Sequence, residues 1–92
     1  MVEPGSSRPT RVRVEVRVEL KPEVQDAEGE SVQRSLGLLG VSGVDRVRVA
    51  RVFELEFDTA DATEAERRAH EAVDRLLANP VIHRVTVRTS GE

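Results

Sequence analysis

The feature that most constrains the fold is an uninterrupted alternation of apolar and charged residues between Arg11 and Leu20. The apolar positions of this run are Val12, Val14, Val16, Val18 and Leu20. Successive side chains of a strand point to opposite faces, so strict period two predicts a strand with one buried and one solvated face. Pro22 lacks a backbone N–H for the ladder and marks the end of this strand.

A first helix is predicted after this strand. Asp26 is a suitable N-cap, because its side chain can accept hydrogen bonds from the first backbone amides of a helix. Val32, Leu36 and Leu39 follow at spacings of four and three residues, which places them on one helical face. Gly40 is well placed to end this helix in the left-handed conformation.

A second helix is predicted to begin between Asp61 and Thr63. Each of these residues has a glutamate three positions later, as a capping box requires, and Thr63 fits that motif better. Asn79 precedes Pro80 and is therefore disfavoured in the helical region, so the helix should end there. The expected inner stripe consists of Ala62, Ala65, Ala69, Val73 and Leu76.

Residues 44–58 are predicted to be extended, because they are rich in valine and phenylalanine, and residues 81–89 are predicted to form a last strand. Arg51 interrupts the apolar positions of the first segment. Either a turn or bulge near Ala50 splits that segment into two strands, or its face changes partner there. The resulting order, β-α-β-β-α-β, predicts an α+β domain of ferredoxin-like topology, with two helices on one face of an antiparallel sheet.

Length and composition define the domain and exclude several classes of protein. The 92 residues form one domain at 11–89, between a flexible leader at 1–10, which contains two prolines, and a flexible tail at 90–92. The chain has no cysteine and no long apolar run, so we expect a cytoplasmic protein that does not enter a membrane. A net charge of −3 and only two aromatic residues argue against nucleic-acid binding.

The sequence offers no recognisable catalytic, cofactor or metal site. Its two histidines, His70 and His83, fall in different elements, and no spacing supplies the further ligands that a metal needs. No serine stands in a Gly-x-Ser-x-Gly elbow. The glycines at 37 and 40 close a helix, whereas a phosphate-binding loop opens one. We therefore expect no catalytic residue and no cofactor bound by this chain.

Three stretches resemble the PurS family of small subunits of phosphoribosylformylglycinamidine synthase. Leu20-Lys21-Pro22 followed by Asp26-x-x-Gly29 is similar to the family's L-K, loop and D-P-x-G pattern. The run Leu76–Ile82, LLANPVI, matches the family at every position. The segment from Val47 to Leu55 is similar to V-R-x-G-K-x-x-E-L, with Ala50 where the family usually has glycine.

The resemblance implies a subunit without catalytic groups of its own. In this family a large synthetase subunit uses ATP, with Mg²⁺, and a glutaminase subunit supplies ammonia, so that together they convert formylglycinamide ribonucleotide to formylglycinamidine ribonucleotide in purine biosynthesis. The small subunit, as a homodimer or a dimer of dimers, would bridge the two. The residues expected at subunit interfaces are Arg48, Arg51, Asn79, Pro80 and His83.

Three other classes of domain share this element order. A small amino-acid-sensing, ACT-like regulatory domain is the main alternative, because it too often begins a helix with D-x-x-G. An RNA-recognition module would need aromatic residues on its central strands and a basic surface. An acylphosphatase-like enzyme would need an arginine in the loop after the first strand, where this chain has Lys21-Pro22-Glu23-Val24-Gln25.

Overall fold

The computed structural model describes residues 11–90 and shows an α+β chain with an antiparallel sheet. The strands are β1 (Val12–Leu20), β2 (Ala50–Phe57) and β3 (His83–Ser90), and the helices are α1 (Ala27–Leu38), α2 (Ala62–Ala72) and the π-helical turn η2 (Val73–Leu77). The predicted leader and the last two residues of the predicted tail lie outside the described residues, while Ser90 belongs to β3.

The alternating segment forms the central strand of the sheet. The strand order is β2-β1-β3, and both neighbours run antiparallel to β1. Val16 lies opposite Phe53 on one side and Val87 on the other, so the apolar positions of all three strands share a face. The four alternating valines of β1 are 0–5% exposed, which confirms the predicted buried face.

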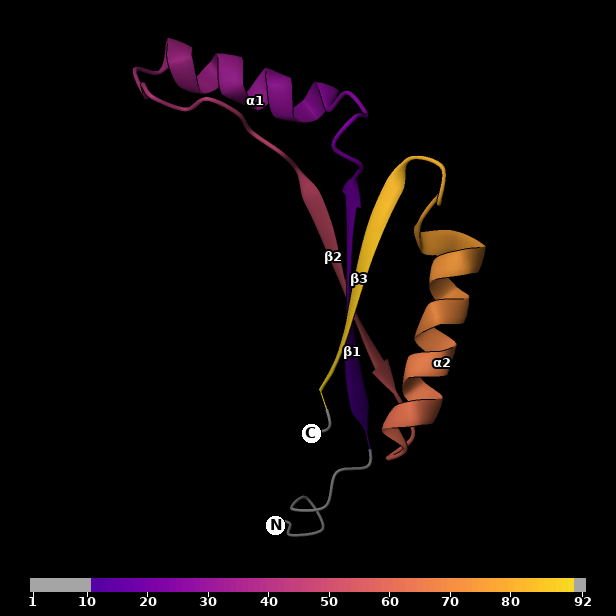
Figure 1. Cartoon of the computed structure of the whole chain (residues 1–92). Coiled ribbons are helices and arrows are strands. Elements are labelled where there is room, and N and C mark those ends of the chain that lie inside the picture. Colours follow the sequence, from indigo (N-terminus) through magenta and orange to yellow (C-terminus); the bar gives the residue numbers. More distant parts are fainter. Residues whose placement is uncertain (1–10, 91–92) are drawn as a thin grey trace, which may run out of the picture.

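Helix α2 covers that valine face (Figure 1). Its contact residues are small: Ala65 and Ala69 are fully buried and let the helix backbone approach the sheet closely. Asp61 caps the helix, because its Oδ1 accepts hydrogen bonds from the amides of Thr63 at 3.0 Å and Glu64 at 3.3 Å. Of the two expected capping residues, the structure therefore uses Asp61.

Helix α1 occupies a different place from the one predicted. It lies beyond the end of the sheet, beside the chain that leads into β2, and only α2 packs on the sheet (Figure 1). The radius of gyration is accordingly 18.1 Å, against about 12 Å for a compact chain of this length. The helix ends as expected: Gly40 has φ +87°, and the Val41 amide donates to the Leu36 carbonyl in a Schellman motif.

Residues 44–58 supply one strand in this chain. Strand β2 begins at Ala50, and residues 44–49 are extended without a partner strand among the described residues. No residue other than glycine has a positive φ there, so Ala50 causes no strain and forms no tight turn. Arg51 lies opposite Val18 on the covered side of the sheet, where it remains exposed.

We call α1 together with residues 39–49 the arm.

Candidate interaction site

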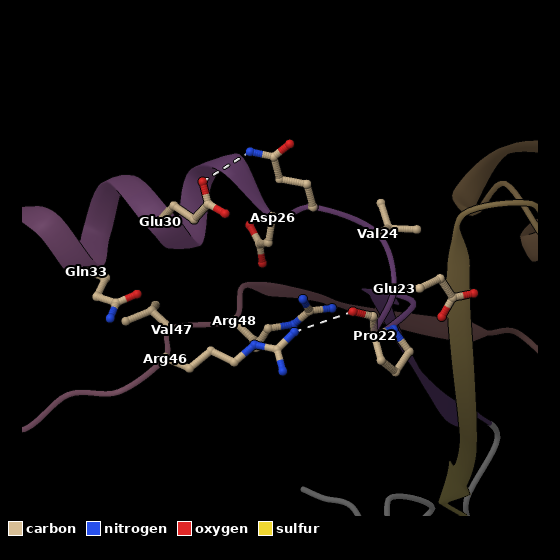
Figure 2. Close-up of a pocket in the computed structure, with 10 residues that line it drawn as sticks. Pro22, Glu23, Val24, Asp26, Glu30, Gln33, Arg46, Val47 and Arg48 are labelled. Atoms are coloured by element: carbon tan, nitrogen blue, oxygen red, sulfur yellow. Dashed lines mark hydrogen bonds between the residues drawn. The ribbon is translucent and has the colours of Figure 1, made fainter.

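The candidate site is the region where the arm joins the sheet. The end of β1, the start of β2 and the turn before β3 meet here, because β1 runs antiparallel to both neighbours. Two open hollows flank the join, of about 280 Å³ and 340 Å³. Figure 2 shows the first, in which Asp26, the N-cap of α1, and Glu30 of α1 face Arg46 and Arg48 across the hollow.

Asp26 is the buried polar residue that fixes the arm. Its side chain is well shielded, with a residue exposure of 6%. Oδ1 accepts a hydrogen bond from the Gly29 amide at 2.8 Å, and Oδ2 accepts one from the Val49 amide at 2.9 Å. The hydrogen bonds from Val49 and Gly29 hold the pKa of Asp26 below its usual value. One carboxylate thus caps α1 and also accepts the hydrogen bond of the Val49 amide, which has no neighbouring strand to pair with.

Gly29 allows the helix and the extended segment to touch. A Cβ at this position would clash with the Val47 carbonyl oxygen and lie 3.1 Å from Cγ of Asp26. The glycine of the Asp-x-x-Gly pattern is therefore required by a close approach of two backbones. The Asp-x-x-Gly pattern marked this position in the sequence, but it did not indicate that the backbone at Val47 packs against Gly29.

Arg48 donates its side-chain hydrogen bonds to backbone carbonyls of this chain. Its Nη2 donates to the Leu20 carbonyl at 2.8 Å and the Lys21 carbonyl at 3.1 Å, while Arg46 reaches the Pro22 carbonyl at 3.4 Å (Figure 2). Of the two alternatives for the segment near Ala50, the turn is wrong, because Ala50 and Arg51 already belong to β2 and no turn separates them from Arg48. An odd spacing in extended chain sends the side chains of Arg48 and Arg51 to opposite sides. Arg51 accordingly lines the second hollow, with Leu77 and His83.

The turn before β3 is closed by side chains of Asn79 and His83. Asn79 Oδ1 accepts from the Val81 amide at 2.9 Å, and His83 Nδ1 accepts from the Asn79 amide at 2.8 Å. Because Nδ1 is an acceptor, the ring carries its proton on Nε2. Pro80 is exposed at the tip of this turn. The three predicted interface residues Asn79, Pro80 and His83 therefore lie together, and Arg48 bonds the neighbouring backbone at Leu20 and Lys21.

Leu76 is not a core residue, contrary to the predicted inner stripe. It is 83% exposed, and Leu77 packs against the core instead. The physical reason is the π-helical turn at Val73–Leu77, which adds a residue to the turn and rotates the side chains that follow. Leu76 and Val81 lie on either side of the turn before β3, and Val81 is 75% exposed. We call these two exposed apolar residues the Leu76 end.

No metal site is present in the part of the chain that the structure describes. Residues 11–90 contain no cluster of three or more His, Cys, Asp or Glu side chains that could hold a metal ion. None of the helices within that range is long and apolar enough to cross a membrane. His70 is exposed on α2, 3.9 Å from Glu66.

A small α+β chain with exposed apolar residues on its arm and at the Leu76 end has the characteristics of a subunit of a larger assembly. The comparisons with known proteins agree with this class. The family described as PurS, phosphoribosylformylglycinamidine (FGAM) synthase, matches residues 13–91, and the chain belongs to this family.

Several characterised relatives are similar over most of their length. The chain is 40% identical to subunit PurS of phosphoribosylformylglycinamidine synthase from Archaeoglobus fulgidus, over 79% of this chain and 91% of the relative. It is also 40% identical to the PurS subunit from Mycobacterium leprae, over 87% and 98% of the two chains.

Solved structures show the same fold. A chain of the PurLQS structure from Thermotoga maritima superimposes with a TM-score of 0.77 and 25% identity, over 87% of this chain and 98% of that chain. PurS from Methanocaldococcus jannaschii, a subunit of formylglycinamide ribonucleotide amidotransferase, gives a TM-score of 0.76 and 28% identity, over 86% and 95%.

Replacing Gly29 with alanine should loosen the arm. The added methyl meets the Val47 carbonyl, and we expect a loss of about 1–3 kcal/mol in local stability, seen as faster hydrogen exchange of the Val49 amide. Gly37→Ala is the matched control, since that position of α1 has no neighbour within 4 Å of a new Cβ. The control should gain about 0.5–1 kcal/mol from helix propensity. Equal exchange rates in the two variants would contradict the close-approach explanation.

The arm should also loosen in acid. Because the pKa of Asp26 is lowered on folding, its contribution is complete above the unfolded value of about 3.9 and is lost as pH falls through the folded value. Exchange of the Val49 amide should therefore accelerate as the pH falls below about 4, beyond the intrinsic trend, and Asp26→Asn should abolish this excess. Glu64→Gln is the control, because Glu64 also has a lowered pKa but pairs with Arg67 and Arg68 on α2. An unchanged excess in Asp26→Asn would refute the assignment.

Proposed function

We propose that the chain is the small assembly subunit of a phosphoribosylformylglycinamidine synthase and links its glutaminase to its ATP-dependent synthetase. The observation that carries the proposal is the family match over residues 13–91, together with 40% identity to PurS subunits across most of both chains. The fold match to a chain of the Thermotoga PurLQS structure supports membership of a multi-subunit assembly. The reaction would take place in the cytoplasm.

The proposed role is structural, and the chemistry would belong to the partner subunits. ATP and Mg²⁺ would bind the large synthetase subunit. Ammonia from the glutaminase would pass to the synthetase within the assembled complex. The contribution of this chain would be to hold the two partners in a fixed relative position.

The arm is the surface proposed for homodimer formation. It leaves an unusual amount of apolar surface uncovered: Leu38 is 88% exposed, Leu39 79% and Val41 47%. Residues 44–49 of the arm also carry backbone groups without a partner strand in the described chain. Exposed apolar surface and an open edge are the features that a second copy of the chain can cover.

The Leu76 end is the surface proposed for contact with a larger subunit. Leu76, Pro80 and Val81 project from it, and the hydrogen bonds of Asn79 and His83 make the turn rigid before any partner binds. A preorganised apolar knob loses little conformational entropy on binding, so it is suited to dock into a pocket. Arg51, near His83 across the second hollow, would lie at the rim of this contact.

Two leucine substitutions should distinguish the role of the arm from the role of the Leu76 end. Leu39→Asp, on the arm, should convert the homodimer to a monomer at micromolar concentration in light scattering. Leu76→Asp should leave the dimer intact and lower glutamine-dependent activity of the reconstituted synthase at least tenfold, while ammonia-dependent activity changes less. Both side chains are largely exposed, so both variants should fold. A dimer that survives Leu39→Asp, or full glutamine-dependent activity in Leu76→Asp, would overturn the respective assignment.

The isolated chain should neither hydrolyse ATP nor release ammonia from glutamine. Sensitive coupled assays at high protein concentration would measure both activities. The variant Ala69→Asp is the control for contaminating enzymes. It places a charge at a fully buried core position and should unfold the chain. Turnover that persists in this variant comes from a contaminant, whereas turnover that disappears with the fold would refute the non-catalytic role.

A further inference from the structure

The turn before β3 is closed by a hydrogen bond whose acceptor is a titratable group, the imidazole of His83. Within residues 11–90 no backbone carbonyl accepts the Asn79 amide. The last bond of η2 runs from the Ala78 amide to the Val73 carbonyl, and the chain becomes extended at Ala78, with φ −147° and ψ 153°. Nδ1 of His83, at the start of β3, supplies the acceptor instead, at 2.8 Å.

The other hydrogen bonds of the turn all end on Asn79. Its carbonyl accepts from the amides of Ile82 at 3.1 Å and His83 at 2.8 Å, and its Oδ1 accepts from the Val81 amide at 2.9 Å. The bond from its own amide to the imidazole therefore fixes the residue around which the turn is folded. Leu76 and Val81 lie on opposite sides of Asn79 in the chain, so the orientation of Asn79 determines how the two side chains of the Leu76 end are spaced.

Protonation of the ring removes this acceptor. A neutral imidazole has one donor and one acceptor nitrogen, whereas imidazolium donates from both. With a proton on Nδ1, two N–H groups would point at each other across 2.8 Å, so the ring has to rotate away or the turn has to open. The closed turn holds the neutral ring and thus binds fewer protons than the open turn. Its stability is therefore complete at high pH and is lost as the pH falls.

The charged groups that face the ring from other elements have mixed signs. The second hollow, which His83 lines, is also lined by Glu19 of β1, Asp26 and Glu28 at the start of α1, and Arg51 of β2, while the residue from η2 is apolar. Glu19 is paired with arginines, and Asp26 is bonded to two backbone amides. Arg51 opposes a second cation and the carboxylates favour one, so the direction of the effect follows from the bond at Nδ1.

We propose that His83 is a positioning residue for the Leu76 end: its neutral ring holds this docking surface in place, and protonation of the ring releases it. The inference rests on the proposed function, because it concerns the surface assigned there to a larger subunit. Linkage makes the effect reciprocal, since a partner that binds the closed turn also selects the unprotonated ring. Assembly of the synthase would then weaken towards acidic pH, and docking would displace a proton from His83.

Two variants of similar shape test the first step on the purified full chain. Oδ1 of asparagine is as many bonds from Cα as Nδ1 of histidine, so His83→Asn keeps an acceptor that does not titrate, and His83→Leu has none. Between about pH 8 and pH 5.5, the protection of the Asn79 amide against hydrogen exchange should fall about threefold to tenfold in the wild type. His83→Asn should stay protected throughout, and His83→Leu should lack protection at every pH.

His70→Asn is the matched control. His70 is the other histidine of the chain and is exposed on α2, so this variant should keep the pH dependence of the wild type. Ring ¹⁵N shifts of the wild type at about pH 8 should show His83 with Nδ1 unprotonated and Nε2 protonated.

Reconstitution of the synthase tests the second step. The concentration of this chain that gives half-maximal glutamine-dependent activity should rise about threefold to tenfold more in the wild type than in His83→Asn between about pH 8 and pH 6. Both chains meet the same partner subunits, so the pH dependence of those subunits cancels in the comparison.

The possible failures are distinguishable. A protonated Nδ1, or protection of the Asn79 amide that does not change with pH in the wild type, would overturn the inference. An equal pH dependence of the wild type and His83→Asn in reconstitution would also overturn it, while the assembly role would stand because activity is restored. If the chain restored no activity with its partners at any pH, the proposed function would be wrong, and the exchange measurements would still decide whether His83 holds the turn.

Discussion

The carboxylate of Asp26 is the interaction on which the arrangement of the arm depends. It accepts one hydrogen bond from the Gly29 amide of α1 and one from the Val49 amide, 23 residues after Asp26, so it joins the start of α1 to the segment that enters β2. Both hydrogen bonds come from backbone amides that would otherwise lack a partner, one at a helix N-terminus and one in the segment just before β2, which has no neighbouring strand. Because these amides hold the carboxylate charged, the join is electrostatic and needs no apolar core of its own.

A polar join explains how a small chain can place a helix away from its sheet. The fully enclosed core is limited to the alternating valines of β1 and two alanines of α2, with partly buried side chains around them. Such a core is marginal for a chain of this length, and the apolar residues of α1 add nothing to it. If another copy of the chain covered the apolar residues of α1, the same contact would stabilise the fold and form the homodimer.

The sequence predicted the elements better than their arrangement. Strict alternation determined β1, and local capping chemistry determined the ends of α1 and α2, because these signals act over a few residues. The position of α1 could not be predicted, since the apolar stripe of Val32, Leu36 and Leu39 has the same spacing whether its own sheet or another chain covers it. Leu76 was misplaced because a π-helical turn leaves no clear sequence signal, and Arg48 because its acceptors are backbone carbonyls 27 and 28 residues away.

The arm and the Leu76 end are anchored on the same short piece of backbone. The Lys21 amide donates to the Ile82 carbonyl at 2.9 Å, which attaches the turn before β3, while the Lys21 carbonyl accepts from Arg48 of the arm at 3.1 Å. Movement of either surface relative to the other would have to break one of these bonds or bend β1. The surface proposed for dimer formation and the surface proposed for a larger subunit thus have a fixed relative orientation. A subunit whose contribution is to position two partners requires this rigidity more than it requires any reactive side chain.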